Sequence, residues 1–131
     1  MKKIFILVII IFIFLSLSCD ITVSQKNTFL FSGNVVDATY GYYLHLIYVD
    51  YEIYDVKDKL IYVGGILTNE YGYFEIYGKH NEAIEDLYKL ELHFYSDYYV
   101  TQRNTSYYNQ WRKNGTNVSY KSLINLNRRY K

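Results

Sequence analysis

The chain has 131 residues, half of them hydrophobic, which is enough for one domain with a buried core. Apart from Lys2 and Lys3, 12 Lys and Arg residues stand against 13 Asp and Glu residues, a net charge of −1. A near-neutral chain without a basic stripe gives no electrostatic basis for binding nucleic acid. The 18 tyrosines favour strands, because aromatic side chains fit the pleated surface of a sheet.

Residues 1–18, MKKIFILVIIIFIFLSLS, have the order of a secretory signal peptide: basic residues, an apolar run and then small residues. The apolar run from Ile4 to Leu17 would be about 21 Å long as a helix, shorter than the ~30 Å hydrocarbon core of a bilayer. The pattern therefore predicts export, with an uncleaved membrane anchor as the less favoured alternative.

The only cysteine, Cys19, follows this segment directly, and the sequence LSLSC resembles the lipobox of bacterial lipoproteins. That resemblance implies a diacylglycerol group on Cys19 and anchoring on the extracytoplasmic side of a bacterial membrane, in the periplasm or at the cell surface. The match departs from the pattern at Ser16, where leucine is usual. The alternative is an ordinary signal peptide with an incidental cysteine, and hence a secreted protein. Residues 19–28 are then predicted as a tether, and residues 29–131 as the folded domain.

Most of the chain from Phe29 onward has the period of two that is typical of half-buried strands. The expected strands span residues 29–37, 42–54, 60–68, 73–78, 88–94, 97–103 and 118–126. Turns are expected at residues 38–41, 55–59 and 69–72, and a loop at 106–117. Residues 81–87 predict one short helix with Asn81 as its N-cap. We therefore expect an all-β fold, a single antiparallel β-sandwich of about seven strands.

Three segments resemble the transthyretin-like superfamily: GNVVDATYG, GGILTNEYGYFEIYG and IEDLYKLELHFYSDYY. The middle one is also similar to transthyretin-like proteins of nematodes and to carboxypeptidase regulatory-like domains. The resemblance implies a transthyretin-like (prealbumin-like) sandwich. One branch of that superfamily is the 5-hydroxyisourate hydrolases, whose catalytic positions are here occupied by Asn34 and Tyr73 and by the C-terminal NRRYK. An asparagine does not titrate near neutral pH and a phenol supplies no fixed cation, so we expect this activity to be absent.

No metal site or cofactor is predicted, because His45, His80 and His93 lack partners at metal-ligand spacing. The remaining candidate site is the aromatic segment SYYNQWRK, in which four side chains are predicted to bind a ligand or partner: Tyr107, Tyr108, Trp111 and Arg112. Tyr, Trp and Arg often anchor interfaces, although Trp111 is also suited to closing the end of a core.

Together these observations predict a non-enzymatic, membrane-anchored lipoprotein that binds an envelope protein or a glycan, in adhesion or envelope assembly. The alternative is a secreted carrier or bridging protein without a lipid.

Overall fold

The computed structural model describes residues 27–129. The predicted signal peptide and Cys19 lie outside this range. The elements in chain order are β1 (Asn27–Asp37), β2 (Tyr48–Asp55), β3 (Leu60–Leu67), β4 (Tyr73–His80), the 3₁₀ turn η1 (Ile84–Asp86), β5 (Leu87–Tyr95), β6 (Gln102–Tyr107), the 3₁₀ turn η2 (Tyr108–Gln110), β7 (Arg112–Asn114) and β8 (Asn117–Leu126).

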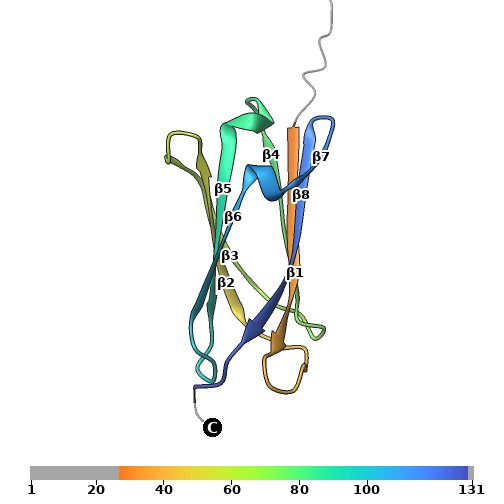
Figure 1. The fold of residues 1–131 in the computed structure, drawn as a ribbon, viewed down its shortest axis with the longest axis vertical. Coiled ribbons are helices and arrows are strands. Elements are labelled where there is room, and N and C mark those ends of the chain that lie inside the picture. The colour runs from red at the N-terminus through yellow and green to blue at the C-terminus, as the bar shows by residue number, and fades with distance from the viewer. Residues whose placement is uncertain (1–26, 130–131) are drawn as a thin grey trace, which may run out of the picture.

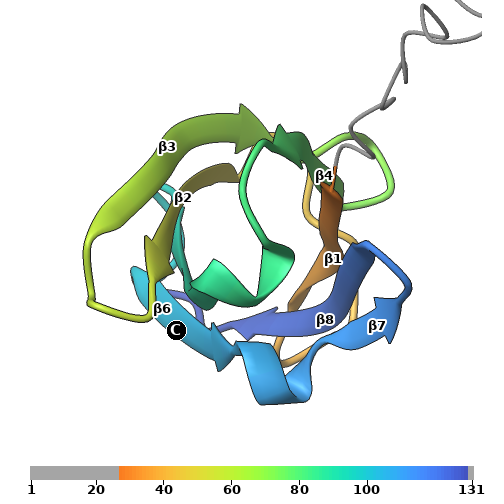
Figure 2. The same ribbon diagram turned by 90° about the horizontal axis from the view of Figure 1, so that it is seen from above.

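The strands form two four-stranded sheets that face each other, as Figures 1 and 2 show. One sheet has the order β4-β1-β8-β7 and the other the order β3-β2-β5-β6. Every pair of neighbouring strands is antiparallel except β1 and β8, which run parallel over Thr28–Asp37. The predicted all-β sandwich is therefore confirmed. Its first and last strands, β1 and β8, are the two middle strands of one sheet.

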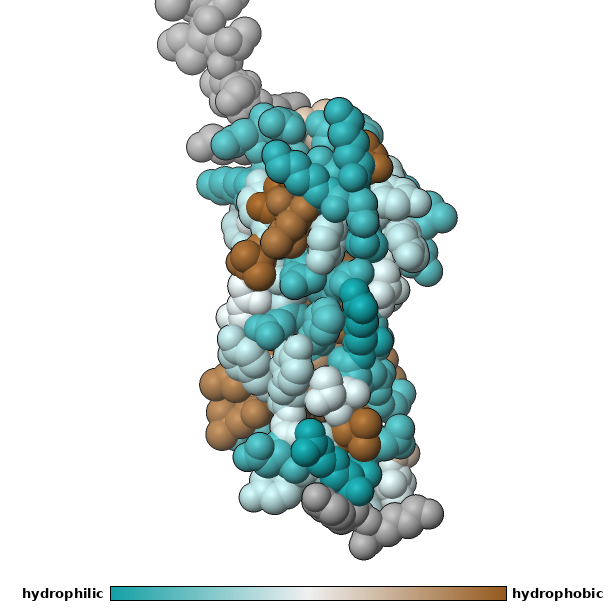
Figure 3. Space-filling view, turned by 90° about the vertical axis from the view of Figure 1, so that its left-hand side faces the viewer, coloured by the Kyte–Doolittle hydropathy of each residue, from teal (hydrophilic) through white to brown (hydrophobic). Residues whose placement is uncertain are grey.

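Alternation along the strands places the core between the two sheets. On β4, Phe74 and Ile76 are buried while Glu75 and Tyr77 face solvent, as the sequence predicts. The same period buries Leu90, Leu92 and Phe94 on β5. Figure 3 shows one face of the molecule, where hydrophilic residues predominate and the hydrophobic ones form separate small groups. The core lies between the two sheets, while strand residues such as Val63 and Leu123 remain exposed on the outside.

The segment TNEYG forms a turn that is stabilised by hydrogen bonds between its side chains and the backbone. The Asn69 carboxamide oxygen accepts hydrogen bonds from the backbone N–H groups of Tyr71 and Tyr73, at 2.9 and 3.0 Å. Gly72 has a φ of +64°, and a Cβ there would lie 2.4 Å from the carbonyl oxygen of Val35. Thr68 is buried, and its hydroxyl donates to the carbonyl oxygen of Leu44 at 2.6 Å. The motif is thus explained by turn geometry.

Several local predictions differ from the structure. The strand predicted at 42–54 begins only at Tyr48, and the one predicted at 97–103 is instead β6, Gln102–Tyr107. The segment around residues 81–87 forms only the three-residue turn η1, whose N-cap is Ala83 and not Asn81. The predicted loop at 106–117 contains the end of β6, η2 and the short strand β7. The first strand begins at Asn27, inside the predicted tether. In the described residues, no helix is long and apolar enough to cross a membrane.

Candidate functional site

His80 is the last residue of β4, and the alternation of that strand turns its side chain inward. Only 5% of the residue is exposed. Its ring packs edge-on against Tyr62 of β3, with 5.8 Å between ring centroids. The imidazole therefore lies at one end of the sandwich, between the two sheets.

Tyr62 determines which nitrogen of His80 is free. Its hydroxyl oxygen lies 3.2 Å from the carbonyl oxygen of Lys79 and 2.9 Å from Nδ1 of His80. The hydroxyl has one proton, which it donates either to this carbonyl or to Nδ1. Either way, the contact with Tyr62 engages Nδ1 of His80 and leaves Nε2 as the ring nitrogen that remains. Within the described part of the chain, this buried Nε2 has no hydrogen-bond partner.

Two carboxylates lie near the imidazole of His80. Glu82 follows two residues after His80, and Asp86 is the last residue of η1. One donor atom from each of His80, Glu82 and Asp86 lies within 4.8 Å of the others. The β2–β3 hairpin is joined to this group, because the backbone N–H of Val56 donates to the carbonyl oxygen of Asp86 at 3.2 Å.

These residues line a cavity of about 200 Å³. The remaining lining residues come from the β2–β3 hairpin, from β3 and from the start of β5: Asp55, Val56, Lys57, Ile61 and Leu87. Three carboxylates face one lysine here, so the cavity has an excess of negative charge. No Lys or Arg of residues 27–129 forms an ion pair with Glu82 or Asp86.

This donor set fits a divalent transition-metal ion. An imidazole nitrogen suits Zn²⁺ or Fe²⁺, carboxylates suit Mn²⁺, and three protein ligands leave a coordination position open for a small molecule. The contact from Tyr62 is of the kind that orients a metal-binding histidine. A cation would also offset the local negative charge.

A second group of this kind, Glu52, Glu91 and His93, fits a metal poorly. Burial raises the pKa of Glu91, but hydrogen bonds from Arg103 and Lys89 more than offset it and lower that pKa overall. Glu52 accepts a hydrogen bond from Tyr54, which raises the pKa of that phenol to about 12. The carboxylates of this group are therefore already engaged.

The structure does not bring the four predicted binding residues together on one surface. Trp111 is buried at 3% exposure, packs on Phe31 at 4.7 Å between ring centroids and donates its indole N–H to Ser106 at 3.0 Å. Tyr108 is half-buried against it, at 5.8 Å. Tyr107 is exposed at the end of β6, and Arg112 lies on β7 of the other sheet. The role of these residues in binding stays a prediction.

The His80 group is not among the sites predicted from the sequence. The spacing His80, Glu82 and Asp86 is a visible signal, with a carboxylate two residues after the histidine. This spacing alone does not predict a site, because Tyr62 of β3 and the β2–β3 hairpin, which complete the surroundings of His80, are distant in the sequence.

No protein-family model matches the chain, and no curated protein matches it either. Among solved structures, its fold is similar to that of 3-chlorocatechol 1,2-dioxygenase from Rhodococcus opacus 1CP, with a TM-score of 0.57 and 16% identity over 82% of this chain. It is also similar to chlorocatechol 1,2-dioxygenase from Pseudomonas putida, with a TM-score of 0.63 and 9% identity over 79% of this chain. The chain spans 62% and 61% of the length of these two enzymes.

A further similar structure is the dioxygenase domain of a dioxygenase–carbohydrate-binding fusion protein from Streptomyces sp. SirexAA-E. Its TM-score is 0.53 and its identity 10%, with 79% of this chain and 83% of that domain covered. At these identities the likeness establishes a shared fold.

These comparisons correct the predicted family and function. The transthyretin-like assignment is wrong, because the neighbours in structure have the fold of catechol dioxygenases. Its motifs are short turn-and-strand patterns, which many sandwiches share. The prediction of a non-enzymatic binding or adhesion protein is contradicted as well, because these neighbours are enzymes. They give no support to a lipoprotein function.

Proposed function

We propose that this chain is an exported, metal-dependent enzyme whose active site is the His80 cavity, and that it oxidises a small phenol of the catechol type. One observation carries the proposal: a buried imidazole with an unpartnered nitrogen lies within a few ångströms of two carboxylates, in a fold similar to that of catechol dioxygenases. The apolar run and small residues of positions 1–18 support export.

The residues of the cavity suit such a substrate. Ile61 and Leu87 offer apolar surface to an aromatic ring, and a cavity of about 200 Å³ is small enough to select a single ring. Lys57 supplies positive charge for an ionised hydroxyl of the substrate. His80, Glu82 and Asp86 would hold the metal, which when bound supplies Lewis-acid and redox chemistry.

The electrostatics lead to a specific expectation for the metal-free protein. Asp55, Glu82 and Asp86 outnumber Lys57, so an anionic phenolate is repelled from the cavity until a cation is present. Binding of the phenol is therefore expected to depend on prior binding of the metal.

The first experiment measures metal binding directly, by calorimetric titration with Zn²⁺, Mn²⁺ and Fe²⁺ under anaerobic conditions. We expect one ion per chain, and an affinity at least about tenfold weaker in Glu82→Gln and Asp86→Asn, since each variant removes a ligand charge. Glu70→Gln is the matched control, because Glu70 is exposed in the turn between β3 and β4. If none of the three ions binds, the whole proposal is wrong.

The second experiment follows oxygen consumption by the Fe-loaded protein with catechol and chlorocatechols. We expect turnover in the wild type and in Glu70→Gln, and none in Glu82→Gln. If the wild type binds metal but consumes no oxygen with any of these phenols, the assigned reaction is wrong while the metal site stands.

A further inference from the structure

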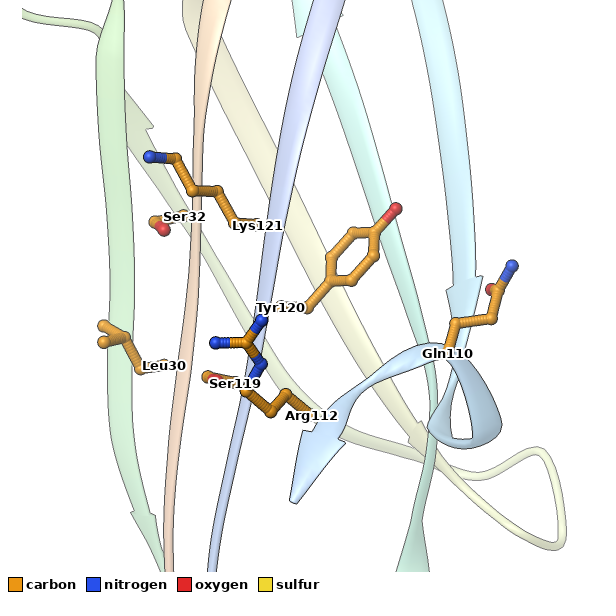
Figure 4. A pocket seen from close by; sticks show the side chains of 7 residues that line it. All are labelled: Leu30, Ser32, Gln110, Arg112, Ser119, Tyr120 and Lys121. Carbon is orange, nitrogen blue, oxygen red and sulfur yellow. The ribbon is translucent and has the colours of Figure 1, made fainter. Parts of the chain in front are cut away.

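A second cavity, of about 450 Å³, lies on the outer face of the β4-β1-β8-β7 sheet and shares no residue with the His80 cavity. Figure 4 shows its lining side chains, which come from β1, η2, β7 and β8. They are Leu30, Ser32, Gln110, Arg112, Ser119, Tyr120 and Lys121.

The register of the strands places its two cationic residues on the same face of neighbouring strands. Arg112 on β7 pairs with Ser119 on β8, and Lys121 is the next residue of β8 on the same face. Diagonal neighbours of this kind are about 7–8 Å apart at the backbone, within reach of one ligand for long side chains. In Figure 4 the guanidinium of Arg112 lies beside β8, and the side chain of Lys121 extends toward β1 and Ser32.

The lining residues supply positive charge and hydrogen-bond donors without a carboxylate. Within residues 27–129, neither Arg112 nor Lys121 forms an ion pair. Glu75, opposite Ser32 on β4, is the neighbouring acid of this face, and its carboxylate accepts a hydrogen bond from the Tyr73 hydroxyl at 2.7 Å. The cavity therefore has a local excess of positive charge.

Neutral donors complete the site. The hydroxyls of Ser32 and Ser119 lie in adjacent rows of the sheet, because Ser32 pairs with Lys121 and Leu30 with Ser119. The carboxamide oxygen of Gln110 accepts the backbone N–H of Tyr107 at 2.8 Å, which leaves its NH₂ group available as a donor.

We propose that this cavity binds the phosphate group of a small organic molecule. The planar guanidinium of Arg112 suits bidentate contact with two phosphate oxygens, and the ammonium of Lys121 adds a second positive charge to the same cavity. Two cations match the charge of a phosphate monoester, and the hydroxyl of Ser119 and the NH₂ group of Gln110 provide donors for its remaining oxygens. This site is separate from the proposed catalytic cavity, so it stands or fails independently of the proposed function.

The test is calorimetric titration of the full mature domain with phenyl phosphate and with inorganic phosphate, at low and at physiological salt. We expect Arg112→Gln and Lys121→Gln each to weaken binding at least about tenfold, and added salt to weaken binding to the wild type. Arg112→Lys should bind with intermediate affinity, because it keeps the charge and loses the bidentate contact. Lys113→Gln is the control, since Lys113 on the same strand lies over the Tyr108 ring at 4.4 Å.

Vesicles of phosphatidylcholine, with and without phosphatidic acid, separate two sources of the phosphate. Binding to phenyl phosphate that depends on Arg112 and Lys121 supports a soluble ligand. Binding to phosphatidic acid vesicles alone, with the same dependence, supports a lipid headgroup. If neither probe binds, or if Lys113→Gln weakens binding as much as the two site variants, the proposal is overturned.

Discussion

At the scale of single residues, buried polar side chains distinguish the structural parts of this domain from the candidate site. Asp37, Thr68, Glu91 and Ser106 are buried, and each has a side-chain hydrogen bond. His80 is equally buried, but its Nε2 has no partner among the described residues. A buried polar atom without a partner costs free energy, and Nε2 of His93 is a second such atom among residues 27–129.

Asp37 leads to a prediction about pH. Its carboxylate accepts hydrogen bonds from Nε of Arg128 at 2.7 Å and from the Tyr99 hydroxyl at 2.8 Å. The Arg128 guanidinium, which outweighs the effect of burial, holds the pKa of Asp37 well below its usual range, and Tyr99 adds to this. Because the folded-state pKa is lowered, the ionised carboxylate stabilises the fold above its unfolded-state pKa of about 4. That stabilisation is lost as the pH falls below this value.

We therefore expect Asp37→Asn to have a lower melting temperature than the wild type at pH 7. The difference between the two proteins should shrink as the pH falls below about 4, since the unfolded wild type then binds a proton that the folded state does not, which favours unfolding. Thermal unfolding followed by circular dichroism from pH 7 to pH 2 measures this. Asp97→Asn, an exposed acid in the loop before β6, is the control and should follow the wild type. A difference in melting temperature between wild type and Asp37→Asn that stays constant from pH 7 to pH 2 would contradict the stabilising role of the Asp37 carboxylate.

Trp111 gives a second prediction at this scale. It is buried between Phe31 and Tyr108 and bonded to Ser106, so Trp111→Ala should lower the free energy of unfolding by about 3–5 kcal/mol. Tyr107→Ala, in the exposed part of the same segment, should cost much less. Urea denaturation of the two variants measures the difference. Equal losses of unfolding free energy in the two variants would show that the buried indole does not stabilise the core.

At the scale of elements, the parallel pairing of β1 with β8 depends on a glycine. Gly33 pairs with Ser122, and a Cβ at Gly33 would lie 2.6 Å from the carbonyl oxygen of that serine. This oxygen belongs to the backbone, so it cannot move aside as the end of a side chain would. Gly33→Ala should therefore destabilise the domain by about 1–3 kcal/mol.

Ser32→Ala is the control for this substitution, because Ser32 is the neighbouring residue of β1 and its side chain faces outward. The free energy of unfolding of both variants, measured in urea, checks the prediction. A Gly33→Ala variant as stable as the wild type would mean that the two central strands tolerate a wider spacing than the structure shows.

At the scale of the whole molecule, the His80 cavity lies at the end where the described chain begins. Asn27 pairs with His80 across β1 and β4, and its carboxamide donates to the carbonyl oxygen of Glu82. A lipid on Cys19 would be separated from Asn27 by a segment that reaches about 30 Å at most when extended. If Cys19 carries that lipid, Asn27 lies within about this distance of the membrane surface.

The lipidation of Cys19 stays a prediction, and it can be tested in a bacterial host. Wild-type protein should fractionate with membranes, and mass spectrometry of its first mature residue should show a diacylglyceryl cysteine. Cys19→Ser should be soluble after export, because the acyl chains that bind the bilayer are then absent. An unmodified N-terminus other than Cys19 in the wild type would contradict the prediction.

The sequence by itself determined the β-sandwich, because a period of two along each strand decides which side chains are buried, as Phe74, Ile76, Leu90 and Leu92 show. It also located the turn at Asn69–Gly72, since only particular residues adopt that backbone. Only the tertiary structure decided the sites. Tyr62 and His80 are 18 residues apart, and Arg112 and Ser32 lie on different strands of one sheet. Such contacts depend on strand order and register, which local patterns do not encode.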